Sequence, residues 1–225
     1  VYFLFGRSGL TKHTRERMDA VNRQVEALFQ RDSAVEKGLE KESRSAYLQS
    51  SYIDKWAGFP LYQNTQTKYY SCGEEMFPDM LEALRGAKHF IFLEYFIIEE
   101  GYMFNTILDI LEEKAKAGVD VRFIYDDVGS INSISFGYYK KLQERGIPCV
   151  TFNPFKPLIS VVMNNRDHRK ICVIDGKIGF TGGINLADEY INKVKRFGYW
   201  KDTGVRIEGE AVWSLTAMFL EMWNY

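Results

Sequence analysis

The feature that most constrains the fold is a short segment in which two apolar runs flank a turn. Residues 171–174 (ICVI) are continuously apolar, which is typical of a strand covered on both faces. Residues 175–177 (DGK) supply turn chemistry, and residues 178–181 (IGFT) form the returning run. The segment therefore predicts a buried β-hairpin.

Polar groups cluster around this hairpin in the pattern H-x-K-x-x-x-x-D followed by G-G-x-N. Read as a strand, His168 and Lys170 point to one face and Arg169 to the other. An imidazole can attack phosphorus and form a covalent phosphohistidine, while an ammonium stabilises charge on the non-bridging oxygens. Asn185, beyond two glycines that allow close backbone approach, can add a neutral donor. A lone histidine or lysine would usually be structural, but together with Asp175 the set predicts metal-free phosphodiester chemistry.

Strand and helix patterns alternate before the hairpin, from residue 88 onward. The predicted order is a strand at 89–98, a helix at 104–117, a strand at 119–125, a helix at 136–145 and a strand at 147–152. Such β-α-β-α-β order predicts an α/β fold with a largely parallel sheet and right-handed crossovers. A helix after residue 73 with a Met-rich buried stripe, an edge strand or hairpin within 61–70, a strand at 205–208 and a helix at 212–225 complete the prediction.

The amino-terminal part differs in composition. Residues 1–5 (VYFLF) are apolar but too few to span a bilayer, which takes about 20 residues, and cations follow them. This pattern fits either the cytoplasmic end of a transmembrane helix or a solvated helix after an apolar terminus. Residues 6–51 predict a helical connector packed on the catalytic domain, which we place at 52–225. Its narrow apolar face would contain Val21, Val25, Leu28 and Phe29.

Three further features leave alternatives open. Glu94 interrupts an apolar strand, so it either lines the active site or marks an exposed sheet position. Asp126 and Asp127 follow a strand, where α/β proteins place ligands, but they could also be turn residues. The apolar residues within 158–163 could form a lid, a lipid-facing lip or an extra strand.

Charge and cysteine content exclude other classes of function. The net charge of −1 gives no global attraction to nucleic acid, so no nucleic-acid partner is expected. The three cysteines, Cys72, Cys149 and Cys172, form no C-x-x-C pair, and the three histidines are scattered. We therefore expect neither a metal site nor a cofactor.

The segment RDHRKICVIDGKIGFTGGINLADEY resembles the H-K-D motif of the phospholipase D superfamily, and in particular the first such motif of bacterial cardiolipin synthases. The stretches GEEMFPDMLEALRGAKHFIFLEYFIIEEG and YDDVGS extend the similarity over most of the chain from Asn64 onward. The resemblance implies a phospholipase D-like sandwich, with a mixed sheet flanked by helices and a juxtamembrane connector before it. It also favours the transmembrane interpretation of residues 1–5 and a cell-membrane location, with the catalytic domain on the cytoplasmic side.

The same resemblance implies a reaction that joins two phosphatidylglycerol molecules into cardiolipin and releases glycerol. His168 would take the phosphatidyl group, while Lys170 and Asn185 would hold its oxygens. Asp202 best matches a carboxylate that hydrogen-bonds the catalytic imidazole in the family. Asp175 is expected to hold the hairpin turn and to act on the chemistry indirectly.

The histidine count implies an incomplete active site. Neither His13 nor His89 repeats the motif, so we expect a second H-K-D motif, either in a carboxyl-terminal half of a longer chain or in a second copy. The sequence looks cut at both ends, and residues 1–225 alone are expected to be inactive. A phosphodiesterase that uses water, either a lipase or a nuclease, is one alternative. A non-catalytic membrane-recruitment module is another.

Overall fold

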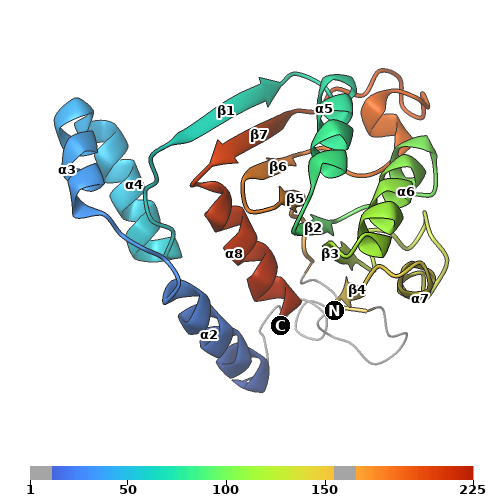
Figure 1. Cartoon of the computed structure of the whole chain (residues 1–225), viewed down its shortest axis with the longest axis horizontal. Helices are drawn as coiled ribbons and strands as arrows, with labels where there is room; N and C mark the ends of the chain where they lie inside the picture. Colours follow the sequence, from blue (N-terminus) through green and yellow to red (C-terminus); the bar gives the residue numbers. More distant parts are fainter. Residues whose placement is uncertain (1–11, 155–165, 225) are drawn as a thin grey trace, which may run out of the picture.

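The predicted hairpin lies at the centre of a seven-stranded sheet in the computed structural model, which describes residues 12–154 and 166–224 (Figure 1). The strands are β1 (Thr65–Tyr70), β2 (Phe90–Tyr95), β3 (Asp120–Asp126), β4 (Cys149–Phe152), β5 (Ile171–Ile174), β6 (Ile178–Gly182) and β7 (Gly204–Gly209). Their spatial order is β1-β7-β6-β5-β2-β3-β4. The hairpin β5–β6 is thus covered by strands on both sides, as its apolar composition requires.

The sheet is mixed, and its parallel part is smaller than the sequence predicts. Among the strands of residues 12–154 and 166–224, only β2, β3 and β4 pair in parallel, because helical crossovers connect them. The other four pairings are antiparallel. A three-residue turn joins β5 to β6, and such a short connection permits only antiparallel pairing. The α/β class is confirmed, but a largely parallel sheet is not.

Helices cover both faces of the sheet and make a three-layered sandwich (Figure 1). They are α2 (Lys12–Glu26), α3 (Ser33–Glu42), α4 (Arg44–Ala57), α5 (Gly73–Gly86), α6 (Tyr102–Lys116), α7 (Tyr139–Glu144), the 3-10 helix η1 (Asp188–Ile191) and α8 (Val212–Trp223). The predicted Met-rich stripe of α5 is buried against one face. On the opposite face, Phe92 of β2 stacks on Phe219 of α8 with ring centroids 4.7 Å apart. Alternate residues of each central strand therefore enter two separate cores.

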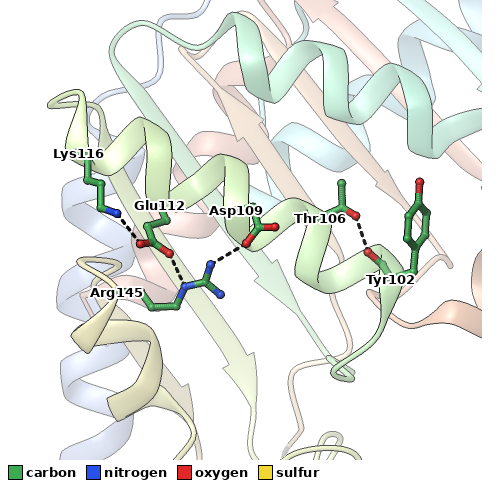
Figure 2. A network of polar contacts seen from close by, with 6 residues as sticks. All are labelled: Tyr102, Thr106, Asp109, Glu112, Lys116 and Arg145. Atoms are coloured by element: carbon green, nitrogen blue, oxygen red, sulfur yellow. Dashed lines mark hydrogen bonds and ion pairs between the residues drawn. The ribbon is translucent and has the colours of Figure 1, made fainter.

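A surface ion-pair network ties α7 to α6 (Figure 2). Arg145, which ends α7, contacts Glu112 at 2.6 Å and Asp109 at 2.9 Å, and Lys116 contacts the same Glu112 at 2.6 Å. Exposed pairs of this kind contribute little free energy individually. The pairs join the end of α7 to α6, while the buried Leu142 packs α7 into the core.

The amino-terminal helices lie on the α8 side (Figure 1). Val25 and Phe29 pack with Ala217 of α8, and the partly buried Val21 packs against them. The predicted apolar face is confirmed at these three positions, whereas Leu28 is 54% exposed. The predicted domain boundary at residue 52 falls inside α4, which continues to Ala57. The predicted membrane stub at residues 1–5 lies outside the described residues. Within 12–154 and 166–224, no helix has the length and apolar character needed to cross a bilayer.

Candidate active site

The segment that contains the H-x-K motif lies just before β5, outside the sheet ladder. Pairing of β5 begins at Ile171, opposite Glu94 on one side and Thr181 on the other. The prediction that His168 and Lys170 belong to the strand itself is therefore wrong. The neighbouring strands continue only one residue past the partners of Ile171, to Tyr95 in β2 and to Gly182 in β6, so the ladder stops at this edge.

His168 and Lys170 nevertheless converge, as predicted, on one side of the chain. The His168 ring lies 4.7 Å from the ring of Phe96, and the Lys170 Nζ lies 5.1 Å from the same ring. The Lys170 ammonium also donates to the backbone oxygen of His168 at 2.6 Å. The His168 side chain is exposed, whereas Lys170 is only 3% exposed. An accessible imidazole thus stands beside a buried cation, on an aromatic support that the sequence reasoning did not identify.

Burial governs the charge of Lys170. It lowers the pKa of the ammonium to about 8, against the opposing effect of the carboxylates of Asp167 and Asp202. The group is thus mainly charged at neutral pH, in a partly desolvated place where a charged donor acts strongly on an anion.

Asp202 lies near Lys170 rather than on the histidine. Its carboxylate accepts from the Thr203 backbone N–H at 2.8 Å. Gly183 passes so close that a Cβ at residue 183 would overlap this carboxylate, which explains the glycine. In the described part of the chain, no hydrogen bond joins Asp202 to the His168 ring. The orienting role of Asp202 remains a prediction.

Asn185 is buried at the same edge of the sheet. Its Oδ1 accepts from the Ile97 backbone N–H at 3.0 Å, and its Nδ2 donates to the Tyr190 hydroxyl at 2.8 Å. The amide therefore links Ile97, which follows Phe96, to Tyr190 of η1. Tyr190 engages one amide hydrogen, and within residues 12–154 and 166–224 the second makes no hydrogen bond.

Asp175 lies at the opposite end of β5 from the motif histidine. It adopts a left-handed conformation with φ 54, and its carboxylate accepts from the backbone N–H groups of Lys88, His89 and Phe90 at 2.7–2.9 Å. Burial opposes ionisation, but the backbone donors together hold the pKa of this carboxyl below its usual range. Asp175 thus holds the hairpin turn against the start of β2 and is not brought together with His168 and Lys170.

A buried ionic cluster lies behind the motif, on the face covered by α8. The Nε of Arg169 lies 2.7 Å from Glu94 and 3.0 Å from Asp167. The contact with Glu94 is an ion pair without hydrogen-bond geometry, so within the described residues neither Glu94 carboxylate oxygen has a hydrogen-bond partner. Burial, reinforced by Asp167, raises the pKa of Glu94 well above its usual range. Glu94 is fully buried, so the exposed-position alternative is wrong.

Asp126 connects this cluster to β3. Its buried carboxylate accepts from the backbone N–H of Gly129 at 2.8 Å and from that of Asp167 at 3.0 Å, and it lies 3.4 Å from Arg166. Since Asp167 precedes His168, the carboxylate helps to hold the motif segment. Asp127 instead lines a pocket at the ends of β3 and β4 whose lining includes neither His168 nor Lys170.

The family described as "Cardiolipin synthase, PLD-like domain" matches residues 80–223. The chain belongs to this family. A cardiolipin synthase of Alkalihalophilus pseudofirmus is 46% identical over 167 residues, which cover 74% of this chain and 33% of that protein. A cardiolipin synthase of Geobacillus is 39% identical over 227 residues, covering 100% of this chain and 45% of that protein. The chain thus spans less than half the length of these curated relatives.

Solved structures show the same fold at low sequence identity. A phospholipase D family member, Nuc from Salmonella typhimurium, superposes with a TM-score of 0.53 at 21% identity and covers 72% of this chain and 94% of its own. NucT from Helicobacter pylori gives the same TM-score at 14% identity, with 72% of this chain and 97% of its own covered. The phospholipase D-like fold is thereby confirmed for this family member.

Proposed function

We propose that the chain supplies the first half of a cardiolipin synthase active site. The observation that carries this proposal is the exposed imidazole of His168 beside the buried ammonium of Lys170. A neutral ring nitrogen of His168 attacks the phosphorus of one phosphatidylglycerol. The bond from phosphorus to the glycerol oxygen breaks, glycerol leaves with a proton from a general acid, and a phosphohistidine remains.

The second half of the reaction regenerates the histidine. A hydroxyl of a second phosphatidylglycerol attacks the phosphohistidine and gives its proton to the group that acted as acid. The nitrogen–phosphorus bond then breaks and cardiolipin is released. Lys170 and the second amide hydrogen of Asn185 hold the non-bridging oxygens through both steps, and Asp202 balances the charge near Lys170.

The general acid has to come from outside this motif. His89 lies just before β2, at the far end of the sheet, and His13 lies in α2. We infer that a second H-x-K-x-x-x-x-D motif faces His168, either from a carboxyl-terminal half or from a second copy. The length of the curated relatives supports the first arrangement.

Hydrolysis is the second candidate, because the His168 side chain is exposed to solvent. With water as acceptor, the same phosphohistidine would yield phosphatidic acid, and a nucleic-acid substrate would be cut.

We place the protein at the bacterial cell membrane with this domain on the cytoplasmic side. Resistance of the whole protein to carbonate extraction checks that location, and recovery in the soluble fraction would contradict it.

The decisive experiment uses His168→Ala, with His89→Ala as its matched control. Both substitutions remove one imidazole from a position just before a strand. Turnover of phosphatidylglycerol by the whole protein should be lost in His168→Ala and kept in His89→Ala. Phosphohistidine is labile in acid. The reaction is therefore quenched under alkaline conditions, and label from the phospholipid is mapped to residue 168. Near-normal turnover by His168→Ala would sink the assignment, and vesicle binding without turnover by the wild type would favour a recruitment module.

A further inference from the structure

A surface loop beside the candidate active site combines cations with exposed apolar side chains. Residues 193–201 (KVKRFGYWK) contain four cations and no acid. Phe197 is 74% exposed, Tyr199 65% and Val194 50%. We refer to residues 193–201 as the rim loop. It follows η1 and leads toward β7, on the upper right of the molecule in Figure 1.

The base of the rim loop is closed by a single side chain. Asn192, in a left-handed conformation, accepts from the Trp200 backbone N–H at 2.6 Å and donates to the Trp200 backbone oxygen at 2.9 Å. It also donates to Glu74 of α5 at 2.8 Å. Both ends of the loop are thereby held together, so the residues between them project from a fixed base.

The rim loop is connected to the active site by direct contacts. The Trp200 ring lies 5.1 Å from that of Tyr190, whose hydroxyl accepts from the Asn185 amide. Asp202, which acts on Lys170, follows the loop directly. The exposed Phe197 ring lies 6.0 Å from Trp200. The loop is therefore a rim of the same site and not a remote surface feature.

Its chemistry matches the surface of an anionic phospholipid bilayer. Aromatic side chains favour the headgroup level of a membrane, and each cation near an anionic leaflet adds attraction. Lys193 lies 4.4 Å from the exposed Tyr102 ring, and Arg196 is shared with Glu99 and Glu189. Lys195 is exposed between Val194 and Arg196 and extends the positive charge beyond these contacts. The aliphatic Val194 fits hydrocarbon better than it fits the base stacking used for single-stranded nucleic acid.

We propose that the rim loop docks on the anionic phospholipid surface that contains the substrate, with Phe197 inserted at the headgroup level. This inference rests on the proposed function, since it concerns the presentation of lipid phosphates to His168. The docked loop would place the Asn185–Lys170 edge of the sheet against the membrane interface, so that a lipid phosphate reaches the imidazole while its acyl chains stay in the bilayer.

A local fluorescence measurement tests the proposal and does not depend on turnover. An environment-sensitive fluorophore is attached at Phe197→Cys in the full chain. Cys72→Ser removes Cys72, which is the most accessible of the three native thiols, so that it is not labelled. The control label is placed at Tyr69→Cys, a 64% exposed position on the edge strand β1. The label at residue 197 should shift to the blue on phosphatidylglycerol vesicles and not on phosphatidylcholine vesicles, whereas the label at residue 69 should not respond.

Charge variants sharpen the test. Lys195→Gln should raise the phosphatidylglycerol concentration for half-maximal shift about five-fold, and Lys177→Gln, in the hairpin turn at the far end of β5, should leave it unchanged. An unresponsive label at residue 197 would overturn the proposal. So would a blue shift without lipid, which would mean that protein covers the loop, or a response to a single-stranded oligonucleotide alone. The imidazole is not needed for docking, so His168→Ala should dock normally. Docking of the wild-type whole protein without turnover would contradict the proposed reaction and leave this inference standing.

Discussion

At the scale of single residues, the pKa of Lys170 predicts the alkaline limit of the reaction. The free protein loses the ammonium as pH rises through about 8, so kcat/KM for phosphatidylglycerol should fall there. A bound phosphate favours the charged form, so kcat should fall at a higher pH than kcat/KM. Coincident alkaline limits for kcat and kcat/KM would contradict a direct contact between Lys170 and phosphate.

The same lowered pKa predicts a change in stability. Between pH 8 and the ordinary lysine pKa, the unfolded chain binds more protons than the folded chain, so the free energy of unfolding should rise with pH in that window. Lys170→Met removes the titrating group, and its urea denaturation midpoints should lack that rise. The comparison with wild type isolates Lys170 from other groups that titrate over the same range.

The ionic cluster behind the motif gives a second prediction at this scale. Arg169→Met leaves Glu94 and Asp167 buried without their cation and should lower the free energy of unfolding by about 3–5 kcal/mol. Adding Glu94→Gln to that variant should restore part of the loss at alkaline pH, where Glu94 is ionised, because a neutral amide is cheaper to bury than a carboxylate. Urea denaturation of both variants measures the free energy of unfolding. A double variant no more stable than Arg169→Met at alkaline pH would show that an ionised Glu94 is not the source of the loss.

At the scale of elements, Asp175 joins the hairpin β5–β6 to β2. Asp175→Ala loses three hydrogen bonds and puts alanine in a left-handed conformation, so the free energy of unfolding should fall by about 3 kcal/mol. Asp175→Asn tolerates that conformation and should lose less. Since the folded-state pKa is lowered, the contribution is present above the usual aspartate pKa and is lost as pH falls through the lower folded value. The difference in free energy of unfolding between wild type and Asp175→Ala should therefore shrink as pH falls through the folded-state pKa, and urea denaturation across that pH range measures it.

Elements set by local sequence could be predicted, and elements set by long-range pairing could not. The hairpin and the α5 stripe follow from periodicity and turn residues within one segment. The pairing of β5 with β2 joins segments about 80 residues apart in the sequence, and no local pattern encodes it. The meeting of Arg169 with Glu94 depends on that pairing, so the charged cluster was missed. The interruption of an apolar strand by Glu94 was the available signal.

At the scale of the whole molecule, the single motif predicts that residues 1–225 do not turn over phosphatidylglycerol alone. The exposed His168 is not joined by His89, which lies at the far end of the sheet. Adding a carboxyl-terminal half with its own H-x-K motif should restore turnover, and the same half with its motif histidine changed to alanine should not. Full turnover by residues 1–225 as a monomer in light scattering would contradict this expectation.

The contact between Asp175 and the start of β2 determines which face of the sheet each β2 side chain occupies. Side chains of a strand alternate between faces, so a shift of β2 by one residue against β5 would exchange its two faces. Glu94 would then turn toward the side of Lys170, and Leu93 would turn toward α8. By holding three consecutive amides of the β2 entrance, Asp175 fixes this register. Asp175, the aspartate of the motif, thus determines on which side of the sheet Glu94 lies, although Asp175 is at the end of β5 farthest from His168.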